Sequence, residues 1–353
     1  MVIFRRDQQI QRKDIVSARN ASPAAHFSRS CCVFLQFVAK SLYQEKSAPG
    51  SMHCSGSARR FPMEDGGPVP REKRFGQEAG KDMKYTVGIT SWCWPDFSSA
   101  AFPRIKKAGF DTLQLEVGSW EDGLPLSKRE IRKEYAEAAA GSGLLLLPVA
   151  VNTVCRHPFT EGLDTPDGAI ALKALDAGVE AAAEMGAEGI TVPNFGRNKI
   201  LDPAGRENTV LALRHACQYA MELGINVYTE NLLPAGELGE LFRDCSYANL
   251  YLLFDSHNYI LHSRDCTMDV LRSWYGRIGS HLHVKAGSGL QSAPLSGGNC
   301  LAGEVLAFLK EKDYAGSIVL ENDYSRPPLF SDDLRFMLDD IGFIRRHAGS
   351  GSI

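Results

Sequence analysis

The 353-residue chain lacks three features that would each assign it to a distinct class of protein. Its longest early apolar run, CCVFLQFVA at 31–39, is far too short to cross a bilayer, so we expect no membrane span. The nine cysteines are odd in number and include no C-x-x-C pair. This pattern argues against a disulfide framework and predicts reduced thiols in a cytoplasmic protein. No G-x-G-x-x-G motif follows the first predicted strand, which disfavours a dinucleotide-binding fold.

A large net charge is also absent, but the value of −3 conceals an uneven distribution. Residues 1–82 contain 14 Lys and Arg against 8 Asp and Glu, whereas residues 83–353 contain 25 against 34. An acidic main part offers no electrostatic footprint for a phosphate backbone. We therefore predict that nucleic acid is not the substrate.

The first 82 residues differ from the rest in pattern as well as in charge. They show neither helical nor strand periodicity and are rich in Arg, Ser, Gly and Pro, which predicts a disordered N-terminal extension. A transit peptide would explain the Arg and Ser but not the acidic residues. Because MKYTVGITSW opens directly into a strand, we favour Met83 as the natural start and an over-extended gene start before it. Residues 83–353 then form the catalytic domain.

From Met83 onward, short β-rich runs alternate with longer amphipathic stretches. Helical stretches such as 127–143, 169–186 and 208–224 end in glycine just before the next strand, as helix stop signals do. The predicted strands number eight: 85–90, 112–117, 144–151, 189–193, 225–230, 250–255, 280–286 and 317–321. Eight such units in roughly 270 residues match a (β/α)₈ TIM barrel, which typically needs about 250. The fold class is therefore α/β, with a doubly wound open sheet as the alternative.

Strongly polar side chains stand at the ends of four consecutive predicted strands. Each is the first such side chain at the top of an otherwise apolar run, and together they are Glu230, Asp255, His283 and Glu321. In a TIM barrel, catalysis takes place where the strands end. Because side chains alternate along a strand, all four can point into the barrel together.

Three carboxylates and an imidazole in one buried mouth need a compensating cation, because burying unpaired carboxylates costs several kcal/mol each. Three oxygen donors and one nitrogen suit one divalent ion, with Mn²⁺ favoured and Mg²⁺, Co²⁺ or Zn²⁺ as alternatives. Taken singly, each residue has an ordinary explanation as a loop ligand, a helix cap or a core histidine. Their equivalent placement on four successive units favours the metal site. His281, one layer deeper, is predicted to support the site rather than to bind the ion.

These residues stand in motifs that resemble the xylose isomerase-like TIM-barrel superfamily, in particular its sugar phosphate isomerase/epimerase family. The resemblance covers Met83 to the C-terminus and is carried by MKYTVGITSW, GFDTLQLE (109–116), VYTEN, FDSHN (254–258), HLHVKAG (281–287) and YAGSIVLEND (314–323). It implies that the four strand-end residues hold one divalent ion, which stabilises the enediolate formed when a proton leaves the carbon next to a carbonyl. It further implies that Glu230 and Glu321 remove and return that proton on opposite faces of the sugar.

The chain departs from the family pattern at several positions near the predicted site. The usual strand-two Glu is Gln114, although Glu116 lies two residues on and on the same face. Asn258 replaces a frequent His, and His257 stands one place earlier. We predict substrate contacts for Glu116, Asn258, His257, Lys285 and Trp92. The Gly-rich stretch 286–299 fits either a phosphate-binding loop or a flexible lid, and we favour the lid.

The resemblance implies a sugar isomerase or epimerase and a small-molecule sugar or sugar phosphate as substrate. A dehydratase of a keto-inositol or related polyol is an alternative, since it would use the same ion and the same enediolate. Endonuclease IV-like DNA-repair enzymes need extra histidines on strands two and three, and 112–117 and 144–151 contain none. A non-catalytic sugar-binding barrel is a further alternative. The protein could also form a homo-oligomer.

Overall fold

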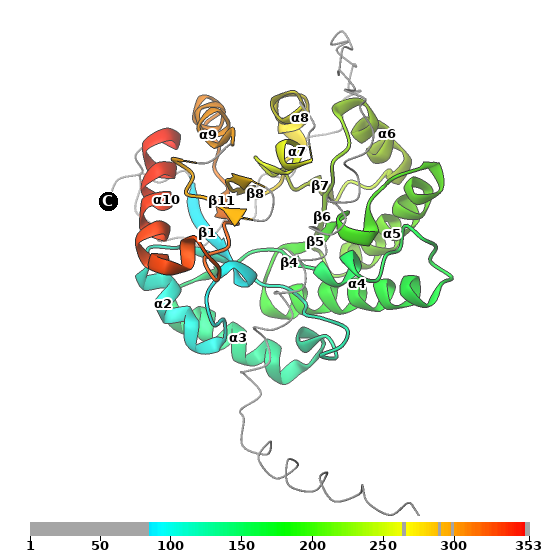
Figure 1. Cartoon of the computed structure of the whole chain (residues 1–353). Helices are drawn as coiled ribbons and strands as arrows, with labels where there is room; N and C mark the ends of the chain where they lie inside the picture. Colours follow the sequence, from blue (N-terminus) through cyan, green and yellow to red (C-terminus); the bar gives the residue numbers. More distant parts are fainter. Residues whose placement is uncertain (1–84, 263–265, 289–290, 298–299, 350–353) are drawn as a thin grey trace, which may run out of the picture.

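The computed structural model describes residues 85–262, 266–288, 291–297 and 300–349. The predictions for residues 1–82 and for a start at Met83 lie outside these ranges. Figure 1 shows strands at the centre of the molecule with helices arranged around them. The strands of the barrel are β1 (Thr86–Thr90), β2 (Thr112–Gln114), β3 (Leu145–Leu146), β4 (Val149–Ala150), β5 (Gly189–Pro193), β6 (Asn226–Glu230), β7 (Leu250–Leu252), β8 (His281–Val284) and β11 (Ser317–Leu320).

One or two helices follow each strand unit, which is the alternation that the sequence predicts. The helices are α2 (Phe102–Lys107), α3 (Arg129–Ser142), α4 (Pro166–Met185), α5 (Pro203–Glu222), α6 (Ala235–Cys245), α7 (Asn258–Leu261), α8 (Thr267–Trp274), α9 (Ala302–Glu311) and α10 (Asp333–Ala348). Helices α3 and α4 end at glycines, as predicted: Gly143 and Gly186 take left-handed conformations at the C-cap. Thr165 caps the start of α4 by accepting the Gly168 N–H, and Pro166 fits the first turn.

All neighbouring strands of the barrel pair in parallel, in the orders β3-β2-β1-β11-β8 and β4-β5-β6-β7. Single bridges join these two sheets, between Glu116 and Ala150 on one side and between Asp255 and His283 on the other. The sheets therefore close into the TIM barrel that the sequence predicts. A short antiparallel pair, β9 (Gly287–Ser288) with β10 (Gln291–Ser292), follows β8 and lies within the Gly-rich stretch.

The predicted strand 144–151 is interrupted and appears as β3 and β4. Leu147 and Pro148 separate the two halves, and proline has no N–H to donate to a sheet. The carbonyl of Pro148 instead accepts a side-chain hydrogen bond from Gln114 inside the barrel. The break therefore turns one backbone oxygen toward the barrel interior.

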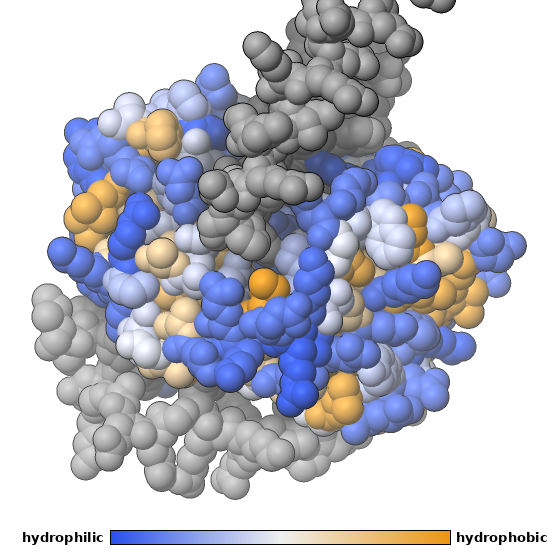
Figure 2. Space-filling view, turned by 90° about the horizontal axis from the view of Figure 1, so that it is seen from below, coloured by the Kyte–Doolittle hydropathy of each residue, from blue (hydrophilic) through white to orange (hydrophobic). Residues whose placement is uncertain are grey.

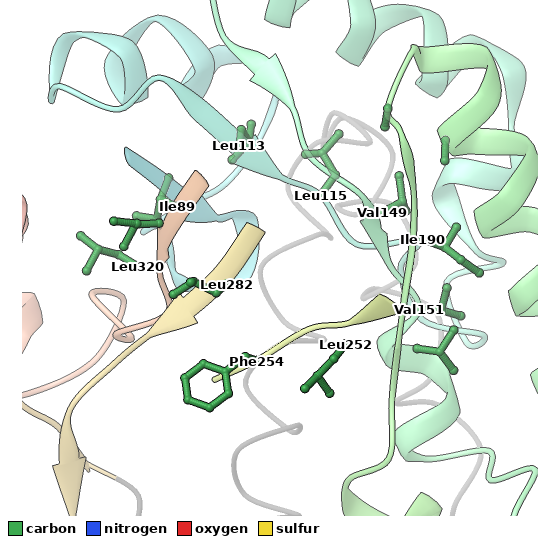
Figure 3. Close-up of a cluster of buried hydrophobic side chains, with 14 of the residues drawn as sticks. Ile89, Leu113, Leu115, Val149, Val151, Ile190, Leu252, Phe254, Leu282 and Leu320 are labelled. Carbon is green, nitrogen blue, oxygen red and sulfur yellow. The ribbon is translucent and has the colours of Figure 1, made fainter. Parts of the chain in front are cut away.

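The two faces of the strands differ in polarity. Figure 3 shows a ring of buried hydrophobic side chains on the strands, which includes Ile89, Ile190 and Leu282. These residues alternate with polar ones such as Gln114 and His281, which hydrogen-bond or approach one another across the barrel. The hydrophobic layer thus packs the strands against the helices, and the polar layer lies inside the barrel below the strand ends.

The outer surface gives no indication of a membrane span. Among the described residues, no helix is both long enough and apolar enough to cross a bilayer. Figure 2 shows one face of the molecule, on which hydrophobic residues stand in small scattered groups among hydrophilic ones. Scattered hydrophobic residues of this kind are normal on a protein surface.

Candidate metal centre

Four side chains from consecutive strands converge at the carboxyl end of the barrel. Glu230 is the last residue of β6, Asp255 follows β7, His283 lies in β8 and Glu321 directly follows β11. One possible ligand atom from each residue lies within 4.8 Å of all the others. The parallel register produces this convergence, since Asp255 bridges His283 and β11 pairs with β8 along its length.

Each of the three carboxylates has one oxygen held by a hydrogen-bond donor. Asp255 Oδ1 accepts the backbone N–H groups of His257 and Asn258, both at 2.7 Å. Glu230 Oε1 accepts the Asn258 side-chain amide at 2.8 Å, and Glu321 Oε1 accepts the Trp92 indole N–H at 3.2 Å. These bonds fix the orientation of the three carboxylates, and the second oxygens of Asp255 and Glu321 both face the Lys285 ammonium.

Two atoms that face the centre of the group lack a hydrogen-bond partner among the described residues. They are Asp255 Oδ2 and His283 Nδ1, and both belong to side chains that are almost fully buried. A buried polar atom without a partner is costly, and such atoms in native proteins call for a ligand or a functional explanation. An oxygen and an imidazole nitrogen of this kind are suitable ligands for a divalent cation. The residues present therefore fit a metal ion.

Lys285 is the cation that this chain itself contributes to the group. Its ammonium lies 2.5 Å from Glu321 Oε2 and 3.3 Å from Asp255 Oδ2. Burial alone would lower the pKa of Lys285, but the neighbouring Asp255, Glu321 and Glu230 carboxylates outweigh it and raise that pKa. Lys285 therefore stays charged and offsets part of the negative charge of the site.

The two glutamates of the group differ in their protonation. Burial raises the pKa of Glu230 to about 8, and the nearby Glu321 carboxylate adds to this effect against the attraction of His283. Burial also acts to raise the pKa of Glu321, but Lys285 and His283 outweigh it and lower that pKa. One carboxyl group therefore favours the protonated form and the other the ionised form at neutral pH, when no ion is bound.

The residues for which we predicted substrate contacts are placed unequally around the group. Trp92, Asn258 and Lys285 each contact a candidate ligand directly. His257 contributes its backbone N–H to Asp255, and its imidazole is buried. Glu116 accepts a hydrogen bond from the Asn152 side chain at 3.0 Å and is not part of the four-residue group.

Gln114 is a member of the site that the sequence did not single out for a function. Its Oε1 lies 2.7 Å from His283 Nε2, the ring nitrogen opposite to the one that faces the carboxylates. The only signal in the sequence was its position in place of the Glu that the family pattern would have on strand two. The contact joins residues from β2 and β8, so no local pattern could have revealed it.

A half-buried carboxylate lies at the opposite end of the barrel, where the strands begin. Glu188 directly precedes β5, and its Oε1 accepts hydrogen bonds from the hydroxyls of Tyr228 and Ser280. Burial raises the pKa of Glu188, and the Tyr228 hydroxyl partly opposes this. Two hydroxyl donors therefore converge on one oxygen of this carboxylate.

Known proteins of similar sequence and fold support the assignment of the barrel to a family. The chain is 28% identical over 247 residues to a 2-epi-5-epi-valiolone 7-phosphate 2-epimerase from Actinoplanes sp., covering 69% of this chain and 88% of that protein. The fold resembles crystal structures of D-psicose 3-epimerase from Clostridium cellulolyticum H10 and 3-keto-D-glucoside 4-epimerase from E. coli. Both have a TM-score of 0.59, with 17% and 18% identity, and each comparison covers 74% of this chain and 99% of the other.

A family model also matches the chain. Residues 102–340, which are more than half of the chain, match the model of the xylose isomerase-like TIM barrel. This range includes all four residues of the candidate metal centre and α3 to α9 in full. The chain therefore belongs to the xylose isomerase-like TIM-barrel family.

Proposed function

We propose that the protein is a divalent-metal-dependent isomerase or epimerase of a sugar or a related polyhydroxylated ketone. The observation that carries this proposal is the convergence of Glu230, Asp255, His283 and Glu321. Within this group, Asp255 Oδ2 and His283 Nδ1 are buried and have no hydrogen-bond partner among the described residues. Similarity to a sugar-phosphate-type epimerase and to two sugar epimerase structures supports the same reaction class.

In this proposal the four residues hold one ion, with Mn²⁺ expected because three of the four donors are oxygens. Once bound, a divalent ion acts as a Lewis acid that polarises a substrate carbonyl. Glu230 and Glu321 transfer protons to and from the carbon beside that carbonyl. Oε1 of each is held, by Asn258 and Trp92 respectively. Oε2 of Glu321 also accepts a hydrogen bond from the Lys285 ammonium, so in this proposal Lys285 moves aside before that oxygen takes a proton.

The remaining groups around the mouth position the substrate. Lys285 carries a positive charge within reach of a substrate oxygen or a phosphate, and the amide of Asn258 and the imidazole of His257 line the same end of the barrel. Glu116, beside Asn152, is proposed to contact a more distant hydroxyl. A phosphorylated substrate is supported by the 7-phosphate in the name of the Actinoplanes relative.

The arrangement gives less support to a repair nuclease of the endonuclease IV type. Within the described residues, one group of His, Cys, Asp and Glu could hold an ion, whereas such nucleases bind three zinc ions. We therefore retain a single-ion site for the proposal.

Metal analysis is the first test. Purified protein, loaded with Mn²⁺ and desalted, should contain about one ion per chain by mass spectrometry. Asp255→Asn is the matched variant, because its Oδ1 can still accept the two backbone N–H groups that hold Asp255 while the second oxygen becomes an amide nitrogen. The variant should fold and lose the ion. A wild-type protein that binds no ion under any loading condition would contradict the proposal.

Proton exchange tests the chemistry. The loaded enzyme is incubated in heavy water with ketoses, their phosphates and cyclitol ketones, and NMR follows replacement of the hydrogen beside the carbonyl. We expect exchange with at least one member of this set, abolished by chelation. Ion binding without exchange on any of them would favour a non-catalytic sugar-binding barrel.

A further inference from the structure

The barrel interior directly below the metal centre contains a small polar cluster built around Gln114. Its side-chain amide nitrogen lies 3.1 Å from the Pro148 carbonyl oxygen, 3.1 Å from Thr191 Oγ1 and 3.4 Å from His281 Nε2. Its amide oxygen lies 2.7 Å from His283 Nε2. All five side chains or carbonyls are buried, so water does not offer them alternative partners.

The Pro148 carbonyl determines which way the amide points. A carbonyl oxygen can only accept hydrogen bonds, so it needs the amide nitrogen of Gln114 in front of it. The opposite orientation would place two oxygens 3.1 Å apart in a buried space, with no proton between them. The amide oxygen is therefore fixed on the side of His283.

An amide oxygen is likewise only an acceptor, so the facing nitrogen of His283 must carry the proton. A neutral imidazole has one N–H, and the other nitrogen then holds a lone pair. That other nitrogen is Nδ1, which has no hydrogen-bond partner among the described residues and lies 3.4 Å from Glu321 Oε2. Burial acts to lower the pKa of His283, but the Glu321, Glu230 and Asp255 carboxylates outweigh it and raise that pKa. Once the ring is neutral, its lone pair on Nδ1 points into the group of carboxylates.

We propose that Gln114 is a positioning residue, which holds neutral His283 as its Nε2–H tautomer and so presents Nδ1 as a metal ligand. The chain of contacts runs from the free carbonyl at the break between β3 and β4, through the amide, to the imidazole. Outer partners that orient a metal-binding histidine in this way typically change metal affinity by about 10- to 100-fold when removed. The inference deepens the proposed function and rests on it for the role of the ion.

Three variants test whether Gln114 orients the His283 ring or only fills space in the barrel interior. Gln114→Leu keeps the approximate size and removes the acceptor for His283. Gln114→Glu keeps an oxygen facing His283 whether the carboxyl group is ionised or donates its proton to Pro148. Thr191→Val is the control, because it removes one partner of the amide nitrogen and leaves both the Pro148 and His283 contacts. Thermal unfolding confirms that each variant folds.

The first readout is the tautomer in protein without metal. Long-range ¹H–¹⁵N NMR on ¹⁵N-histidine protein resolves the two ring nitrogens, and a His283→Gln spectrum assigns the signal among the nine histidines. Spectra are taken at a pH above which the imidazole signal no longer changes. We expect the Nε2–H form in the wild type, in Thr191→Val and in Gln114→Glu, and a mixed or Nδ1–H form in Gln114→Leu.

The second readout is the Kd for Mn²⁺ and for Co²⁺ by titration calorimetry. We expect Gln114→Leu to weaken binding about 10- to 100-fold, Gln114→Glu to restore most of it and Thr191→Val to leave it unchanged. A wild-type Nδ1–H form, or a Gln114→Leu variant that retains tautomer and affinity, overturns the inference. A wild type with the Nε2–H form that binds no ion would support the tautomer assignment while overturning the proposed function.

Discussion

At the lower end of the barrel, Glu188 lies between the hydroxyls of Tyr228 and Ser280, which both donate to it. At the upper end, both oxygens of Glu321 accept hydrogen bonds, from Trp92 and Lys285. Asp255 Oδ2 accepts no hydrogen bond from the described residues and has the Lys285 ammonium 3.3 Å away. Glu188 is half-buried, whereas Asp255 is almost fully buried. The two ends differ in whether a buried acceptor is left without a hydrogen bond.

The difference in hydrogen bonding between the two ends is more informative about function than the burial of their carboxylates. Burial raises the pKa of Glu188 at one end and of Glu230 at the other, so a perturbed pKa alone would not distinguish the two ends. The distinguishing feature is the pair of bare atoms, Asp255 Oδ2 and His283 Nδ1, turned toward a common point. Hydroxyl donors reach the carboxylate at the lower end, whereas at the upper end a buried oxygen and a buried nitrogen lack a hydrogen-bond partner among the described residues, which fits a ligand site.

The largest contrast should appear in catalysis. Glu321→Gln removes a proposed proton-transfer group, and the rate of hydrogen exchange beside the substrate carbonyl should fall by about 10²- to 10⁴-fold. Glu188→Gln is the matched substitution at the lower end and should leave the rate unchanged. NMR exchange assays in heavy water measure both variants. Equal losses in the two would show that the ends do not differ in function.

The next largest effect should be stabilisation by the ion. At a free Mn²⁺ concentration of 100 times the Kd, the free energy of unfolding should rise by about 2.7 kcal/mol, because the ion binds the folded state. Asp255→Asn should lose this increase and Glu188→Gln should keep it. Urea unfolding with and without Mn²⁺ gives the comparison. An increase that persists in Asp255→Asn would place the ion elsewhere.

The contribution of Glu230 to the stability of the protein without metal should fall as the pH rises from about 5 to 8, whereas burial lowers the pKa of His281 and His257, which contribute in the opposite direction. The folded-state pKa of Glu230 is about 8, above its ordinary value, so the folded protein keeps a proton that the unfolded chain releases in this window. Stability declines wherever the folded state binds more protons, here by roughly 1–3 kcal/mol. The raised pKa of Glu188 acts in the same direction.

Urea unfolding at pH 5, 6.5 and 8 assigns the pH effect to one end of the barrel. Glu230→Gln should flatten the profile more than Glu188→Gln, because the latter carboxyl group has two hydroxyl donors for its ionised form. Glu321, whose pKa is lowered, contributes stability that is lost only as the pH falls below its ordinary value. If only Glu188→Gln flattened the pH dependence of the free energy of unfolding, the effect would belong to the lower end of the barrel and the prediction would be wrong.

The smallest effect should come from Tyr228→Phe, which removes one of the two donors to Glu188 and keeps the ring. We expect a loss of about 1–2 kcal/mol in the free energy of unfolding, the usual cost of one buried hydrogen bond. The Kd for Mn²⁺ should not change, since the substitution acts at the other end. Denaturation and calorimetry measure the two quantities. A weakened Kd would show that the two ends are coupled through the barrel interior.

The sequence predicts much of this architecture because alternating patterns are local. All eight predicted strand units are present, and the residues at the ends of four of them meet because parallel strands end at one edge. The roles of Glu230, Asp255, His283 and Glu321 remain proposals. The predicted strands are longer than the observed ones at 112–117 and 250–255, where single bridges at Glu116 and Asp255 replace continuous pairing.

What the sequence could not predict depends on distances across the barrel. The hydrogen bond between Gln114 and His283 joins residues 169 positions apart, and its existence depends on the register of strands that are not neighbours. The break at Pro148 could not be predicted either, because it depends on a hydrogen bond between the Pro148 carbonyl and the Gln114 side chain inside the barrel. Lys285 was expected to meet substrate, and its contact with two candidate ligands follows from how β8 and β11 pair.

That contact of Lys285 has a practical consequence. Because an ammonium group lies against Glu321 and Asp255, the carboxylates keep a counter-charge when no ion is bound. We therefore expect chelation to leave the barrel folded, so that one stripped preparation can be reconstituted with several different ions in parallel. If a divalent ion took the place of the Lys285 ammonium between these carboxylates, the ammonium would be free to meet an anionic group on the incoming molecule. Metal loading and substrate capture would in that case be successive uses of the same charge.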